Sequence, residues 1–118
     1  MARASRLPQM KTIKLSTGLQ RLRKLNDEIR YHNFFKEKTF TSGLISFRSR
    51  RGVDPKQINH DDKDVVCQVI KGRGRLRCGG KRIALTPGMV CHIPKGTPHD
   101  FAAEKSELVL FYSLIETK

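Results

Sequence analysis

Two histidines and one aspartate have the side chains and the spacing to hold a metal ion together. His60 and Asp62 are separated by one residue, so they share a face wherever this segment is a regular strand. With the more distant His99 they form a set of two imidazoles and one carboxylate, which suits non-haem iron. We therefore predict a metal site made of His60, Asp62 and His99, for one divalent ion such as iron, manganese, nickel or zinc.

Three further residues are candidates for contacting a small molecule beside that site. Cys67 and Gln68 lie in the nearly apolar run Val65–Ile70, and His92 lies in the run Met89–Ile93. A cysteine buried in a strand is more often a packing residue than a ligand, and His92 is equally well explained as a partly exposed structural histidine. All three stay as ligand-binding candidates with this alternative beside them.

A row of arginines at alternate positions forms the third candidate site. Arg73, Arg75 and Arg77 point the same way if they lie on one strand. They predict an anion-binding surface for phosphate groups or nucleic acid, although no aromatic residues alternate with them to stack on bases. The alternative is a charged edge strand whose cations prevent aggregation.

The charge of the whole chain also favours polyanions. Lys and Arg number 24 against 11 Asp and Glu, which gives a formal net charge of +13. The first 26 residues hold seven cations and no acid, so nucleic acid is a candidate partner of this segment, with a solvated basic face or an organelle transit peptide as alternatives. No apolar run is long enough to span a membrane. Three cysteines without a CxxC pair predict free thiols and a cytoplasmic protein.

The elements that must position these residues change in type at about residue 40. Residues 1–15 read as an extended arm, and Ser16 or Thr17 is a candidate N-cap for a helix. This amphipathic helix of about 14 residues carries an apolar stripe that would pack on the rest of the chain or on a second subunit, as in a homodimer: Leu19, Leu22, Leu25 and Ile29. The predicted division is an arm and helix over 1–39, followed by an all-β domain over 40–118.

Short segments rich in β-formers follow one another through the second part. Gly79-Gly80 between two of them is a good signal for a two-residue hairpin turn, and Pro87-Gly88 marks another turn. With no alternation of strands and helices, the pattern predicts an antiparallel sandwich or closed barrel. The predicted strands are residues 40–48, 65–70, 75–78, 81–85, 89–93, 98–102 and 108–114.

One segment of this part carries a family resemblance. Gly88-Met-Val-Cys-His-Ile-Pro94-Lys-Gly96-Thr-Pro-His99 resembles the second conserved motif of the cupins, which reads Gly, five residues, Pro-x-Gly, two residues, His. The motif's terminal Asn falls on Ala103 and is absent. The resemblance implies a jelly-roll barrel, also called a double-stranded β-helix, in which His99 is a metal ligand.

The first cupin motif is matched only in part. Counting back from Gly72, its second histidine falls on His60, whereas its first histidine falls on Ile58 and its glutamate on Val65. The resemblance therefore implies a barrel whose usual ligand set is degenerate, and two imidazoles alone rarely hold a catalytic ion.

Three functions follow from these observations. The favoured one is a barrel that binds a small polar or acidic molecule, with metal weak or absent. The second is a metal-dependent cupin enzyme of the dioxygenase or the isomerase and epimerase type, which would use His60, His99 and a carboxylate. The third is a nucleic-acid or partner-binding protein whose contact surface is the basic N-terminal segment.

Overall fold

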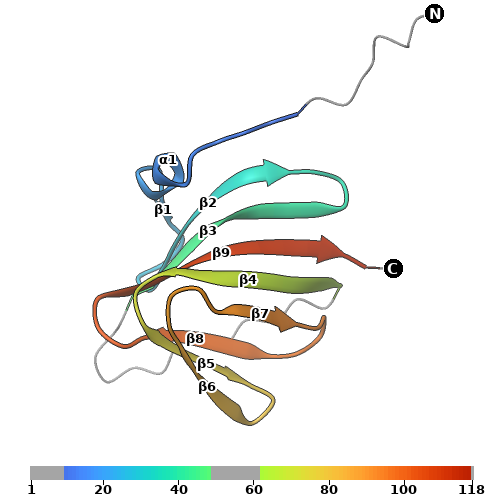
Figure 1. Ribbon diagram of the computed structural model, residues 1–118. Helices are drawn as coiled ribbons and strands as arrows, with labels where there is room; N and C mark the ends of the chain where they lie inside the picture. Colours follow the sequence, from blue (N-terminus) through green and yellow to red (C-terminus); the bar gives the residue numbers. More distant parts are fainter. Residues whose placement is uncertain (1–9, 49–61, 118) are drawn as a thin grey trace, which may run out of the picture.

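Two antiparallel sheets make up most of the protein in the computed structural model, which describes residues 10–48 and 62–117 (Figure 1). The larger sheet has the order β1-β2-β3-β9-β4-β7, and the smaller one has the order β6-β5-β8. The jelly-roll fold predicted from the sequence is thereby confirmed. The strands of the larger sheet are β1 (Arg23–Lys24), β2 (Ile29–Lys36), β3 (Phe40–Arg48), β4 (Lys63–Lys71), β7 (Val90–Ile93) and β9 (Glu107–Glu116).

The smaller sheet packs on the inner side of the larger one, with β8 approaching β3 and β9, and it appears below β4 and β7 in Figure 1. It consists of β5 (Gly74–Cys78), β6 (Lys81–Leu85) and β8 (His99–Ala103). Gly79 and Gly80 join β5 to β6 with φ angles of 58° and 79°, the positive values that a tight type I′ hairpin needs at both positions. The hairpin predicted from this glycine pair is therefore present.

The hydrophobic core fills the space between the two sheets. The strand β4 alternates, with the inward Val65, Cys67 and Val69 buried and the outward Gln68 exposed. The inward residues of several strands form one cluster: Ile29, Phe47, Val65, Cys67, Val69, Leu76, Leu85, Ile93, Phe101, Leu108 and Leu110.

The segment before Phe40 differs from its prediction. The helix α1 spans only Leu15–Leu19, and its N-cap is Lys14, without a side-chain cap from Ser16 or Thr17. Gly18 sits in its middle, where an added Cβ would lie 2.3 Å from the ring of Phe34, so α1 packs closely on the outer face of β2. The prediction of a 14-residue helix is wrong because the chain leaves the helix after one turn and pairs as strands.

The second half of that predicted helix is instead β1, a turn and the first residues of β2. The strand β2 pairs with β3 from Ile29↔Phe47 to Lys36↔Thr41, with a bulge between Asn33 and Phe35. The larger sheet therefore begins before Phe40, where the sequence placed the first strand. Within the described part of the chain, no helix has the length and apolar character needed to cross a membrane.

Candidate functional site

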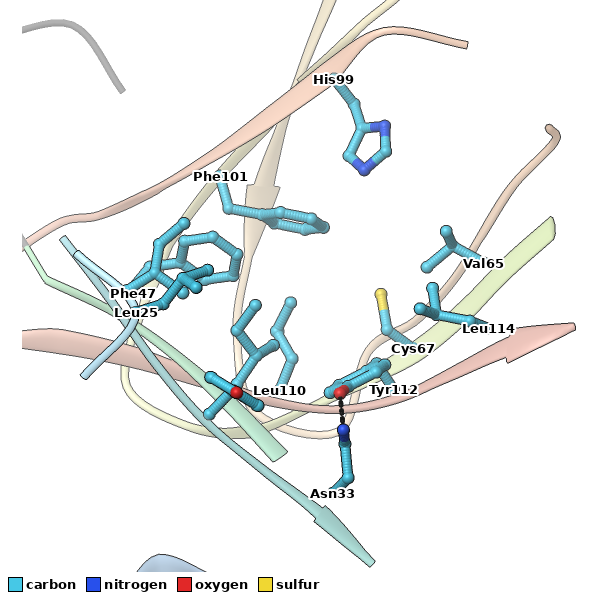
Figure 2. A pocket seen from close by; sticks show the side chains of 13 residues that line it. Leu25, Asn33, Phe47, Val65, Cys67, His99, Phe101, Leu110, Tyr112 and Leu114 are labelled. Carbon is cyan, nitrogen blue, oxygen red and sulfur yellow. Dashed lines mark hydrogen bonds between the residues drawn. The ribbon is translucent and has the colours of Figure 1, made fainter. Parts of the chain in front are cut away.

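A cavity of about 270 Å³ lies between the sheets and is lined chiefly by apolar side chains (Figure 2). Its walls come from β2, β3, β4, β8 and β9, together with the turn after β1. Every one of these elements contributes inward positions, so the cavity is an incompletely filled part of the core. The lining residues are Leu25, Ile29, Tyr31, Asn33, Ile45, Phe47, Val65, Cys67, His99, Phe101, Leu110, Tyr112 and Leu114.

His99 is brought to this cavity by the turn that precedes β8. Pro94 accepts a backbone hydrogen bond of 3.3 Å from Thr97, and Gly96 has a φ of 77°, as the third position of such a turn requires. The His99 side chain is 3% exposed, and Figure 2 shows its ring pointing into the cavity beside Phe101. The Pro-x-Gly segment therefore aims this histidine inward, in the manner that the sequence motif predicts.

The hydrogen bond of His99 defines its tautomer. The Nδ1 atom lies 2.8 Å from the carbonyl oxygen of Thr97. Since a carbonyl oxygen only accepts, Nδ1 carries the proton, and Nε2 is the nitrogen with the lone pair in the neutral ring. His99 is thus held as an oriented imidazole whose Nε2 is its basic atom.

The opposite wall has a second polar group, which the sequence did not reveal. The Tyr112 hydroxyl of β9 donates a hydrogen bond to Asn33 Oδ1 of β2 (Figure 2). Gly43 lies between them in the sheet, since it is the register partner of both residues. Burial and the neighbouring Tyr31 raise the pKa of Tyr112 to about 12, so its hydroxyl stays protonated at neutral pH.

Cys67 faces the cavity, as its alternation with Val65 predicts. Its register partner across β4 and β7 is Cys91, which is half-buried. Burial, with a smaller contribution from Cys91, raises the pKa of the Cys67 thiol to about 12. The thiolate is the reactive form of cysteine, so Cys67 is a poor nucleophile at neutral pH.

The deeper burial of Cys67 predicts that its thiol reacts more slowly than that of Cys78. With iodoacetamide at pH 8, we expect the half-buried Cys78 to be alkylated at least tenfold faster than Cys67, whose thiol is both buried and protonated. Peptide mass spectrometry over a time course measures both rates in the same sample. Equal rates in the folded protein would contradict the placement of Cys67, and equal rates in urea serve as the control.

Three predicted site residues do not line the cavity. Asp62 is 68% exposed in its side chain, and its carboxylate contacts Lys63 at 3.3 Å. Gln68 lies on the outward face of β4, because Cys67 and Val69 on either side of it point inward. His92 is exposed on β7 for the same reason, as its neighbour Ile93 is buried. Strand alternation thus separates Gln68 and His92 from His99, whereas Asp62 precedes β4 and points into solvent.

The described residues around His99 do not fit a resident metal ion. No group of three or more His, Cys, Asp or Glu side chains within 10–48 and 62–117 lies close enough to bind one. His60, the other predicted ligand, lies outside the described residues. Catalytic sites generally need three protein ligands, so no reaction step through a metal is derived from His99 and its neighbours.

The arginine row divides into two parts. Arg75 and Arg77 both contact Asp100 of β8, a residue with 1% exposure, and Arg77 does so through Nε at 3.0 Å and Nη2 at 2.8 Å. Arg73 precedes β5, and its carbonyl oxygen accepts a hydrogen bond from Glu104. The alternative of a charged edge strand is wrong, because β5 is the central strand of its sheet.

Comparisons with known proteins agree on one fold. Residues 49–115 match the family model described as Cupin domain. No curated protein sequence matches the chain. Many solved structures resemble it in fold, all of those compared below at under 25% identity.

Three of these structures show how closely the fold is matched. The cupin domain of Cnp3 from Schizosaccharomyces pombe has a TM-score of 0.70 at 14% identity, over 81% of this chain and 68% of that one. KdgF from Halomonas sp. has a TM-score of 0.69 at 18% identity, over 81% and 88%. Hydroxypropylphosphonic acid epoxidase from S. wedmorenis has a TM-score of 0.71 at 17% identity, over 80% of this chain and 54% of that enzyme, which has also been solved with Fe(II).

Proposed function

The chain belongs to the cupin family, and from this premise we propose that its barrel binds one small, uncharged, mainly apolar molecule that carries a hydroxyl group. The cavity beside His99 is the binding site. Concave, mostly apolar cavities with a few oriented polar groups are the usual form of small-molecule sites. Fold alone does not decide the ligand, which depends on the residues that line the cavity.

The observation that carries the proposal is the charge of the lining. Among the 13 lining residues that belong to 10–48 and 62–117, none is Lys, Arg, Asp or Glu. A carboxylate or phosphate transferred into such surroundings would lose its hydration without gaining a counter-charge, which costs several kcal/mol or more. The lining therefore favours a neutral, mainly apolar ligand over the small polar or acidic molecule that the sequence predicts.

The size of the cavity limits the ligand to about one ring. An engineered apolar cavity of roughly 150 Å³ holds benzene, and the present volume of about 270 Å³ leaves room for a ring with one or two substituents. Phe47 and Phe101, whose ring centroids lie 5.0 Å apart, offer aromatic surface at one side. Tyr112, Asn33 and His99 supply the polar groups that would orient a hydroxyl.

A pair of matched probes tests the proposal. We expect phenol to stabilise the folded protein by about 1.4 kcal/mol at ten times its dissociation constant. The thermal unfolding midpoint rises as a result. Benzoate has a similar ring and a negative charge, and we expect no rise from it. EDTA should leave the effect of phenol unchanged, because no lining contact in the proposal passes through a metal.

Two substitutions on β4 place the binding in the cavity. Val65→Phe fills the cavity, whereas Val66→Phe adds the same volume on the outward face of the strand. We expect the phenol effect to disappear in V65F and to persist in V66F. Equal stabilisation by benzoate, or a phenol effect that survives V65F, would overturn the proposal.

A further inference from the structure

The outward strand positions of the small sheet carry arginine, alanine and one aspartate. Leu76 of β5 points into the core, so Arg75 and Arg77 point outward. Across the sheet Arg75 has Ala84 and Ala102 as register partners, whereas Arg77 has Arg82 and Asp100. The outward side chains thus form two rows across the sheet. One row consists of Ala84, Arg75 and Ala102, and the other of Arg82, Arg77 and Asp100.

Asp100 fixes the two central arginines on this face. Its Oδ2 atom accepts the hydrogen bonds of Arg77, and its Oδ1 atom lies 3.5 Å from Arg75 Nη1. The carboxylate itself is 2% exposed, while the arginine side chains keep 30% and 34% exposure. The two guanidinium groups are therefore held in place and still reach solvent, so little side-chain entropy remains to be lost when an anion binds.

The arginines at these positions carry more positive charge than the Asp100 carboxylate neutralises. The six outward strand positions sum to a charge of +2, and Arg82 stands directly opposite Arg77, where like charges are unfavourable. An anion at the surface would relieve this repulsion. The register partners of Arg75, Ala84 and Ala102, have small side chains.

We propose that Arg75, Arg77 and Arg82 on this face bind the phosphate groups of a nucleic-acid backbone without reading its sequence. Guanidinium groups match phosphate oxygens in geometry and charge. The six outward positions hold no aromatic side chain on which bases would stack, so contacts to the backbone dominate. This surface is separate from the cavity, which is on the inner side of the sheets, and its function does not depend on the ligand proposed there.

The test measures binding of a fluorescein-labelled single-stranded DNA of mixed sequence to the full chain by anisotropy, from 50 to 200 mM NaCl. The variant R75Q/R82Q removes two cations but keeps the contact of Arg77 with Asp100, so the sheet stays intact. We expect its affinity at 50 mM to fall at least tenfold. The slope of log K against log salt should become shallower by about 1.4, which is two contacts at roughly 0.7 each.

The control K36Q/K38Q removes the same charge from the exposed hairpin between β2 and β3. We expect its affinity to fall less than threefold, with the slope changed little. An equal loss in both variants would show a general effect of net charge and overturn the assignment. Displacement of the DNA by inorganic phosphate at equal phosphate concentration would also overturn it, since the site would then take single phosphates. No binding at 50 mM NaCl would do the same.

Discussion

Gly43→Ala is expected to lower the free energy of unfolding by about 3 kcal/mol, at the upper end of what overpacking costs. A Cβ at this position would lie 2.2 Å from the carbonyl oxygen of His32 and 2.8 Å from the Cα of Asn33. Both atoms belong to the backbone of β2, so no side-chain rotation relieves the clash. The strand β2 must therefore move away from β3 at Asn33, where its bulge begins.

The same movement would disturb the cavity. Asn33 and Tyr112 reach each other across Gly43, so a displaced β2 weakens their hydrogen bond. Urea unfolding followed by circular dichroism measures the loss of stability. Loss of the phenol effect in the variant would show that the cavity wall has moved as well.

A second glycine provides the control. Gly80 has a φ of 79° in the β5–β6 turn, and no heavy atom lies within 4 Å of the position of its Cβ. Gly80→Ala therefore carries only the cost of a left-handed backbone for alanine, about 1 kcal/mol. If the two variants lose the same stability, the clash with β2 is not what distinguishes Gly43.

The strands after Phe40 were predictable because each carries its own local signals. The pair Gly79-Gly80 has one common structural solution, and the alternation around Leu76 or Cys67 sorts inward from outward residues without knowledge of the partners. The inward aim of His99 was likewise encoded locally, in the turn between Pro94 and Thr97. Residues within a dozen positions of one another determine all these features.

The segment before Phe40 was misread because two periods coexist in it. Leu19, Leu22, Leu25 and Ile29 recur at helical spacing, yet Ile29, Tyr31 and Asn33 alternate inward along β2. Asn26 ends any helix, since its side-chain oxygen accepts hydrogen bonds from the backbone N–H groups of Glu28 and Ile29. Pairing with β3 over the whole of β2 then outweighs the weak helix preference of so short a stretch.

The contents of the cavity were beyond local prediction. Asn33 and Tyr112 are 79 positions apart, and their contact exists only because β3 brings β2 and β9 to its two sides. Asp100 gave no signal either, although it follows the histidine that the motif identified. The pairing of Asp100 with Arg77 depends on the register of β8 against β5, which places the two residues opposite each other. The sequence pattern indicated charges but could not pair them.

Arg77→Ala is the second substitution with a large expected effect, again about 3 kcal/mol in the free energy of unfolding. It removes the two shortest contacts of the Asp100 carboxylate among the described residues and leaves that of Arg75 Nη1, at 3.5 Å. Removing one partner of a buried ion pair typically costs 3 to 5 kcal/mol, and the partial exposure of Arg77 favours the lower end. Against a total stability of about 5 to 15 kcal/mol, this is a severe loss.

Two further variants distinguish the cost of leaving the Asp100 carboxylate without Arg77 from the cost of losing the packing of the Arg77 side chain. Arg75→Ala keeps the bidentate contact of Arg77, so it should cost about 1 kcal/mol or less. In R77A/D100N the buried group is neutral, and we expect about half of the stability lost in R77A to return, since an amide is cheaper to bury than an unpaired carboxylate. If R77A/D100N is no more stable than R77A, Arg77 acts through the packing of its aliphatic stem on the sheet. Urea unfolding of all three variants decides between these causes.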